Sequence, residues 1–224
     1  MINYTLIRSN RKTTAIYVRG GDVEVRAPLK MPKRDIERFI SEKEQWIRET
    51  LASQQNQAEK KASFAIDYES SILFRGSPYP IIARGGTQAG FDEKSFYMPP
   101  GLIPEQIKST CVKLYKMLAK NHISHRVVFF AKQMGVAPTA VKINSAKTRW
   151  GSCSSQRSLN FSWRLIMAED DIIDYVVVHE LAHIKEMNHS ARFWAVVEGV
   201  LPDYQGCKSK LKELQQRLVG EDWE

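Results

Sequence analysis

Three histidines and a glutamate lie close together near the C-terminal end of the chain. Residues 179–189 read His-Glu-Leu-Ala-His-Ile-Lys-Glu-Met-Asn-His, which places three of the five histidines of the chain in one short segment. On a helix, His179 and His183 would lie one turn apart on the same face. Two such imidazoles can reach one ion at about 2.0–2.1 Å, the distance typical of zinc. The spacing predicts a metal site for one zinc ion per chain, which another divalent metal could replace.

Glu180 directly follows the first of these histidines and is not needed as a ligand. Its carboxylate is therefore free to accept a proton from a water molecule whose pKa zinc lowers toward about 7. The segment predicts a hydrolase in which Glu180 is the catalytic base.

A catalytic zinc site usually has three protein ligands and one open position. His189 is the expected third ligand, although it lies too far past His183 to share its helical face. We expect the helix to end near Met187 and Asn188 to turn the chain back in a left-handed conformation. Glu198 is a weaker alternative, because glutamate also binds zinc.

The histidines need a helix to carry them, and apolar spacing predicts one. This helix is expected to be capped by Asp170 or Asp171 and to continue through the histidines, and Ser190 is expected to cap the next helix. Before it, a helix should start at Pro104, break near Asn121 and end before Gly135. The remaining elements expected in this half are strands 140–144 and 159–166 around the loop 147–155, and helices 191–200 and 204–218.

The N-terminal part has a different character. A β-hairpin or meander is expected from strands at 4–7, 15–18 and 23–27, followed by a charged helix over 35–61 and by β and turn structure over 64–100. The fold class is therefore α+β. We expect an N-terminal β-rich lobe with one long helix over 1–100 and a metal-binding catalytic core over 101–224, or one continuous domain over 1–224.

The composition of the chain limits the class of protein and the cellular location that we expect. The chain of 224 residues is 43% hydrophobic and 26% charged, as in ordinary globular proteins. It has no apolar run long enough for a membrane span and no secretory signal at its start, so no membrane association is expected. Its three cysteines form no CxxC pair, which fits a reducing compartment, and the expected location is cytoplasmic. The net charge of +8 would attract acidic partners. The oligomeric state is not readable from these residues.

With these motifs in view, the chain resembles the YgjP-like metal-dependent hydrolase family, which is similar to the WLM and SprT-like zincin peptidases. The resemblance is carried by segments along most of the chain: 8–12, 25–28, Thr148 to Cys153, Asn160 to Leu165, and Val176 to Trp194. It implies a zincin-like core, zinc on the three histidines and Glu180 as base. It also implies that the strand containing Asn160 corresponds to the edge strand that binds extended substrate in zincins.

Several other residues are candidates for a role in substrate binding, in orienting a ligand or in the core. Arg149 could bind a carboxylate or phosphate of the substrate bidentately, or could form an ion pair that fixes its loop. Asn160 is a second candidate for substrate binding. Glu186 could orient a ligand histidine. Trp150 and Trp163 are expected in the core.

Three functions remain open at this point. The first is a zinc metallopeptidase that acts on peptides or proteins. The second is a metal-dependent nucleotide pyrophosphatase of the UTP type, which the positive charge and Arg149 favour, although phosphohydrolases more often use carboxylate-rich sites. The third is a nucleic-acid-associated module in which zinc is structural, which fits a pI of about 9.4. A structural zinc needs four ligands, and only three are evident.

Overall fold

The computed structural model describes residues 2–223, which form two compact units. The first unit runs to Phe64 and includes Val219–Asp222, and the second comprises Ala65–Leu218 with Trp223. Helices and three mixed sheets occur together, which confirms the α+β class. The sequence-based division into domains 1–100 and 101–224 stays a prediction.

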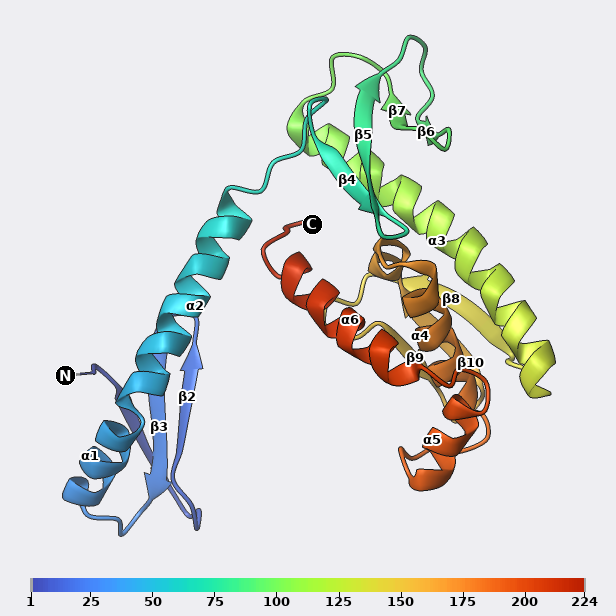
Figure 1. The fold of residues 1–224 in the computed structure, drawn as a ribbon. Coiled ribbons are helices and arrows are strands. Elements are labelled where there is room, and N and C mark those ends of the chain that lie inside the picture. The colour runs from blue at the N-terminus through green and yellow to red at the C-terminus, as the bar shows by residue number, and fades with distance from the viewer. Residues whose placement is uncertain (1, 224) are drawn as a thin grey trace. The chain divides into compact units, whose positions relative to one another are not determined.

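The first unit is a three-stranded sheet covered by two helices (Figure 1). Its strands confirm the predicted positions, and β2 and β3 form the expected hairpin, but β1 pairs in parallel with the far side of β3. The prediction of one continuous helix over 35–61 was wrong, because the helix is interrupted at Lys43 and forms two helices. Val25 and Ile36 are among the fully buried residues that join sheet and helices. The elements are β1 (Thr5–Ser9), β2 (Ala15–Arg19), β3 (Asp22–Pro28), α1 (Lys33–Glu42) and α2 (Glu44–Ala62).

The second unit begins with a four-stranded sheet of order β4–β5–β7–β6, formed by β4 (Ser71–Phe74), β5 (Ser77–Ala83), β6 (Gly90–Phe91) and β7 (Phe96–Met98). The long helix α3 (Pro104–Met134) follows and ends at Gly135, whose φ of 64° is left-handed as expected. The predicted break near Asn121 does not occur. Ala119 and Ile123 are both fully buried, so packing on each side of Asn121 keeps the helix continuous. Among the described helices, neither α3 nor any other is long and apolar enough to cross a membrane.

A second sheet of the same unit has the order β8–β10–β9. It consists of β8 (Ala140–Asn144), β9 (Gly151–Cys153) and β10 (Ser158–Ser162), and the 3₁₀-helix η1 (Trp163–Met167) follows. Strand 140–144 is confirmed, whereas the strand predicted over 159–166 turns into η1 after Ser162. The central strand β10 pairs in parallel with β8 and antiparallel with β9. The edge strands of this sheet are therefore β8 and β9, and the expectation that the strand of Asn160 is an edge was wrong.

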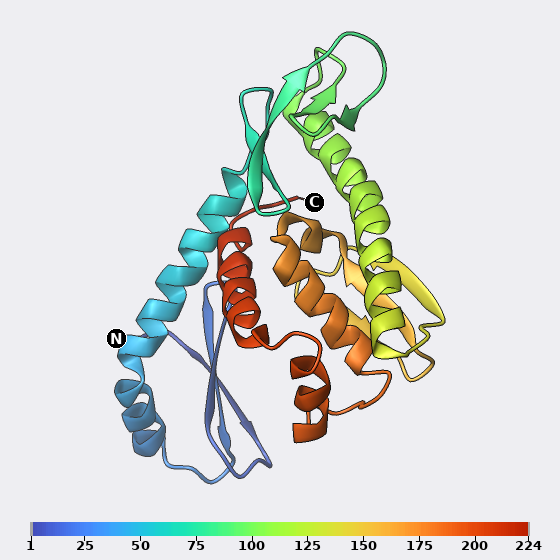
Figure 2. The same ribbon diagram turned by 45° about the vertical axis from the view of Figure 1, so that its right-hand side comes forward.

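Three helices complete the unit: α4 (Asp170–Ala182), α5 (Ala191–Glu198) and α6 (Tyr204–Leu218). Helix α4 lies between α3 and α6, with β9 also against it (Figure 2). Its run Val176, Val177 and Val178 is poor in helix propensity, but all three side chains are buried. Tertiary packing on several sides therefore holds this helix, whose second half is largely buried.

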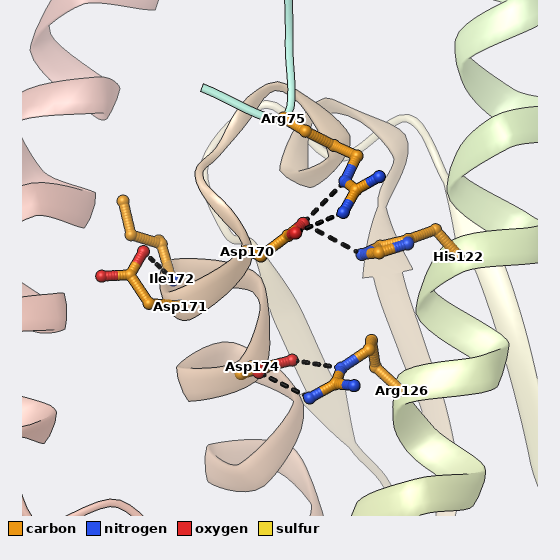
Figure 3. A network of polar contacts seen from close by, with 7 residues as sticks. All are labelled: Arg75, His122, Arg126, Asp170, Asp171, Ile172 and Asp174. Carbon is orange, nitrogen blue, oxygen red and sulfur yellow. Dashed lines mark hydrogen bonds and ion pairs between the residues drawn. The ribbon is translucent and has the colours of Figure 1, made fainter. Parts of the chain in front are cut away.

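Ion pairs attach the first half of α4 to its neighbours (Figure 3). Arg126 of α3 binds Asp174 through two contacts of 2.5 and 2.7 Å. Asp170 accepts two hydrogen bonds from Arg75, and His122 Nε2 lies 3.3 Å from the same carboxylate. Neither aspartate predicted as a cap fulfils that role, because Glu169 is the residue at the cap position and no side chain caps the helix. Asp170 and the following aspartate lie instead in the first turn, where negative charge favours the helix dipole.

Candidate metal centre

The turn after α4 begins earlier than expected. The helix ends at Ala182, not near Met187, and its last turn tightens through hydrogen bonds from Ile184 N to Leu181 O and from Lys185 N to Ala182 O, both of 3.0 Å. Such bonds to the third preceding residue are common where a helix ends. His179 therefore lies in the last turn of α4, and His183 lies at the position just past its end.

His189 is turned toward the other histidines by a tight bend. Ser190 N donates to Asn188 O over 2.7 Å, which closes a three-residue γ-turn around His189. Asn188 has no positive φ, so the predicted left-handed conformation was wrong. Ser190 then caps α5 as expected, since its hydroxyl accepts a hydrogen bond from Phe193 N over 3.4 Å.

The three histidines form a cluster. One nitrogen from each of His179, His183 and His189 lies within 4.8 Å of the others, and the ring centroids are 4.7 to 5.0 Å apart. The Nε2 atoms of His179 and His189 are 3.0 Å apart. Among residues 2–223 no further histidine, cysteine or carboxylate joins this group.

This geometry suits a bound metal ion. Two nitrogens on one tetrahedral zinc, each at about 2.0–2.1 Å, would be roughly 3.4 Å apart, close to the observed separation of His179 and His189. His183 Nδ1 lies 3.2 Å from the main-chain oxygen of Glu186. When that nitrogen donates, Nε2 of His183 keeps its lone pair for a metal. Glu186 thus supports the histidine through its main chain and not through the carboxylate that sequence analysis considered.

Burial prepares two of the histidines to act as ligands. It lowers the pKa of His179 to about 3, and the neighbouring His183, His189 and Lys208 act in the same direction. Burial also lowers the pKa of His183. Both rings are therefore neutral at neutral pH, which is the form that binds metal.

Two aromatic residues of α5 support the cluster, and sequence analysis missed them. The ring of Phe193 is fully buried and lies 4.6 to 4.9 Å from all three imidazoles. Trp194 stacks on His189 at 5.8 Å. Helical spacing from Ser190 could have placed both residues in the first turn of α5, but only the turn at His189 brings that helix against the histidines.

Glu180 lies beside this cluster in a tightly enclosed position. Its side chain is buried and makes no hydrogen bond or ion pair with any residue from 2 to 223, and burial raises its pKa to about 7. Gly151 of β9 lies directly against it. A methyl group on Gly151 would be 2.5 Å from Glu180 Oε1, a distance that real contacts do not allow.

A cavity of about 190 Å³ opens beside Glu180 and His179. Its walls come from α4, α6 and the start of β9 in the second unit, and its lining residues are Trp150, Gly151, Tyr175, Val176, His179, Glu180 and Leu211. Trp163 is fully buried in the core, as predicted, whereas Trp150 is only half-buried at this wall. The prediction for Trp150 was therefore only partly right.

The other predicted site residues lie outside the lining of this cavity. Arg149 is exposed and has no ion pair in the described chain, so no such pair fixes its loop. Asn160 is half-buried on β10, in register with Ser152 of β9. Glu198 is exposed at the end of α5 and is not part of the histidine cluster. Substrate-binding roles for Arg149 and Asn160 stay predictions.

Comparison with known proteins defines the class. The family described as YgjP-like, metallopeptidase domain, matches residues 12–214. The match spans most of the chain, which is thus a metallopeptidase domain by family. The chain belongs to the YgjP-like family, and the resemblance found in the sequence is confirmed. No curated protein matches the chain.

Two crystal structures of metallopeptidase zymogens are similar to part of the chain. They are abylysin of Pyrococcus abyssi, with 22% identity and a TM-score of 0.40, and jannalysin of Methanocaldococcus jannaschii, with 20% identity and a TM-score of 0.37. Each comparison covers 42% of this chain and 95% of the other. The assignment of the chain to its family rests on the match over residues 12–214.

Proposed function

We propose that the chain is a zinc-dependent peptidase that hydrolyses peptide bonds of peptides or proteins. His179, His183 and His189 hold the metal, and Glu180 is the general base. The observation that carries the proposal is that a histidine of the cluster and the buried Glu180 carboxylate line the same cavity. A family of metallopeptidase domains is the setting in which this combination is expected.

When bound, zinc would supply a Lewis acid that polarises the substrate carbonyl and lowers the pKa of water toward about 7. Glu180 accepts a proton from the attacking water, whose oxygen forms a bond to the carbonyl carbon. The C–N bond then breaks, and Glu180 delivers the proton to the leaving nitrogen. The absence of hydrogen bonds to Glu180 from residues 2–223 leaves both carboxylate oxygens available for these transfers.

Edge strand β9 offers a place for the substrate backbone. It pairs with β10 on one side only, and its first residue, Gly151, lies against Glu180. An extended peptide could add to the free side of β9 and so present a peptide bond to the base. Only a substrate with a peptide backbone can form the main-chain hydrogen bonds that the free side of β9 offers, which favours a peptide as substrate.

The lining of the cavity argues against a nucleoside triphosphate. No lysine or arginine is among its lining residues, although a phosphate chain is normally bound by such cations. Arg149 is exposed nearby in sequence, but it is not part of the lining. A purely structural zinc is disfavoured because the three histidines have no fourth protein ligand among the described residues.

The setting proposed for the enzyme is a reducing compartment such as the cytoplasm. Its three cysteines are free, and burial raises the pKa of Cys111 to about 12, which keeps that thiol unreactive. The net charge of +8 would favour acidic protein partners through long-range attraction.

The test compares wild type with Glu180→Gln, both loaded with zinc. Each is assayed against a mixed peptide library and against a panel of nucleoside triphosphates. The substitution keeps size and hydrogen bonding but removes the base, so peptide hydrolysis should fall by about 10²–10⁴ while zinc content stays the same. Loss of triphosphate hydrolysis alone would support the pyrophosphatase. Equal turnover of every substrate by both chains would leave only a structural role for the metal.

A further inference from the structure

The cavity beside Glu180 has a wall that belongs to neither the histidine segment nor β9. This wall is formed by the side chain of Leu211, a half-buried residue of α6. Helix α6 has no part in the histidine cluster, yet it brings an aliphatic side chain to the space next to the proposed base. Tyr175 and Val176, one turn before His179 on α4, form the adjoining wall.

The walls are held firmly in place. Tyr175 and Val176 are buried, with 5% and 3% of their surfaces exposed. The ring of Tyr175 lies nearly parallel to that of Tyr204, and Tyr204 in turn stacks on Trp194 at 5.2 Å. A pocket whose walls are fixed by such packing is preorganised, so its shape can discriminate between side chains.

The volume suits one side chain. A cavity of about 150 Å³ with apolar walls is large enough to bind benzene, and this one measures about 190 Å³. Sites for whole drug-sized ligands usually measure about 300–1,000 Å³. A single leucine, methionine or phenylalanine side chain therefore matches the space.

The charge of the lining excludes other side chains. Glu180 and His179 are its only residues with ionisable groups besides the phenol of Tyr175. The lining contains no lysine or arginine, so an acidic side chain would lie beside the Glu180 carboxylate without a basic side chain to pair with, and burying such a charge is unfavourable. A lysine or arginine could pair only with Glu180, which would remove the base from the reaction.

From these observations we infer that Leu211 is a specificity-determining residue. With Trp150, Tyr175 and Val176 it forms a pocket for one uncharged, apolar side chain of a substrate residue directly adjacent to the scissile bond. This inference rests on the proposed peptidase function and adds the type of peptide that the enzyme selects.

The experiment maps cleavage sites by mass spectrometry. Zinc-loaded wild type is incubated with a mixture of synthetic peptides in which all pairs of neighbouring residue types occur. One of the two positions flanking the scissile bond should prefer leucine, methionine or phenylalanine over aspartate and lysine by roughly 10–200-fold in kcat/KM, the range that one pocket can supply.

Two substitutions of Leu211 test its role. Leu211→Glu adds a carboxylate to the wall, so cleavage at apolar residues should fall about tenfold or more, and lysine or arginine should gain at the same position. Leu211→Ala enlarges the pocket and should shift the preference toward tryptophan. Gln216→Glu is the matched control, because it adds the same charge to an exposed position of the same helix and should leave the preference unchanged.

Binding gives an independent readout. In calorimetric titration, zinc-loaded Glu180→Gln should bind a peptide with leucine at the mapped position more tightly than its aspartate counterpart, and the further change Leu211→Glu should reduce that difference about tenfold. Cleavage without apolar preference, or a preference that Leu211→Glu and Leu211→Ala both leave unchanged, would overturn the specificity inference alone. If wild type cleaves no peptide, the proposed function is wrong, and this inference is wrong with it.

Discussion

The α-carbon of Gly151 lies so close to Glu180 that any side chain at residue 151 would collide with the carboxylate. The added carbon would be 2.5 Å from Oε1 and 2.8 Å from the carboxyl carbon. A glycine at this point of β9 is therefore explained by the carboxylate behind it and not by backbone conformation, since its φ is not positive.

Substitution of that glycine should displace the proposed base. Gly151→Ala should lower peptide hydrolysis by on the order of 10²-fold, because misplacing a catalytic group by about 1 Å has an effect of this size. Zinc content should be unchanged, as measured by elemental analysis. Gly85→Ala is the control, because a methyl group at Gly85 would contact nothing within 4 Å. Full activity of Gly151→Ala would mean that Glu180 does not need its present position.

Metal content distinguishes the ligands. Wild type should retain about one zinc per chain after dialysis. His183→Ala and His189→Ala should each retain almost none, because two remaining imidazoles form a much weaker site. Glu198→Ala should behave like wild type, since this exposed residue lies outside the histidine cluster. If elemental analysis found that His189→Ala retains zinc and Glu198→Ala loses it, the glutamate would be the third ligand.

Phe193 should affect zinc affinity without touching the metal. Phe193→Leu removes the ring that packs on all three imidazoles, so the histidines should lose part of their fixed orientation. We expect zinc affinity to fall about 10–100-fold, the usual effect of residues that orient ligands. Phe96→Leu, at another fully buried phenylalanine, is the control. Both should lose about 0.5–3 kcal/mol of stability, but only Phe193→Leu should weaken zinc in a competition titration with a chelator.

The Arg75–Asp170 pair predicts a pH dependence of stability. The guanidinium of Arg75 holds the pKa of Asp170 below its usual range, chiefly through the hydrogen bonds between them. A lowered pKa in the folded state gives stability that is present above the unfolded pKa of about 3.9 and is lost as pH falls through the folded value. Asp170→Asn should therefore destabilise the chain at pH 7 by at most about 1 kcal/mol, because the pair is partly exposed.

Urea unfolding measures this difference at neutral and at acid pH. The stabilities of wild type and Asp170→Asn should converge as pH falls below about 4. Asp22→Asn, at an exposed aspartate without an ion pair in the described chain, should change little at either pH. A difference that persisted at acid pH would assign the effect to packing and not to charge.

The approach of the three histidines to one another could be predicted from the sequence because the information is local. His179, His183 and Glu180 need only a helical backbone to take their places, and valines and leucine around them make that helix evident. His189 was also correctly expected to point toward the other two histidines, but the type of turn expected at Asn188 was wrong. A γ-turn has no strong residue signature of its own, so the sequence could not distinguish it from a left-handed asparagine.

Features that depend on contacts between segments far apart in the chain could not be predicted from local sequence patterns. Strand order is an example, since alternation of polar and apolar residues does not reveal whether β9 or β10 lies at the edge. Leu211 is another, because its helical spacing identifies a buried face without indicating what that face meets. The same holds for Phe193, whose contact with the histidines depends on the bend before α5.

All three proposed ligands lie within residues 179–189, and this has a consequence for the order of assembly. Joining groups so close along a chain costs little loop entropy, so a polypeptide that has not yet folded can already chelate the ion. Because the denatured ensemble then competes for the metal, added zinc should raise the melting temperature by less than its affinity for the native site implies. Capture of the ion during synthesis can thus precede the packing of α5 against the histidines.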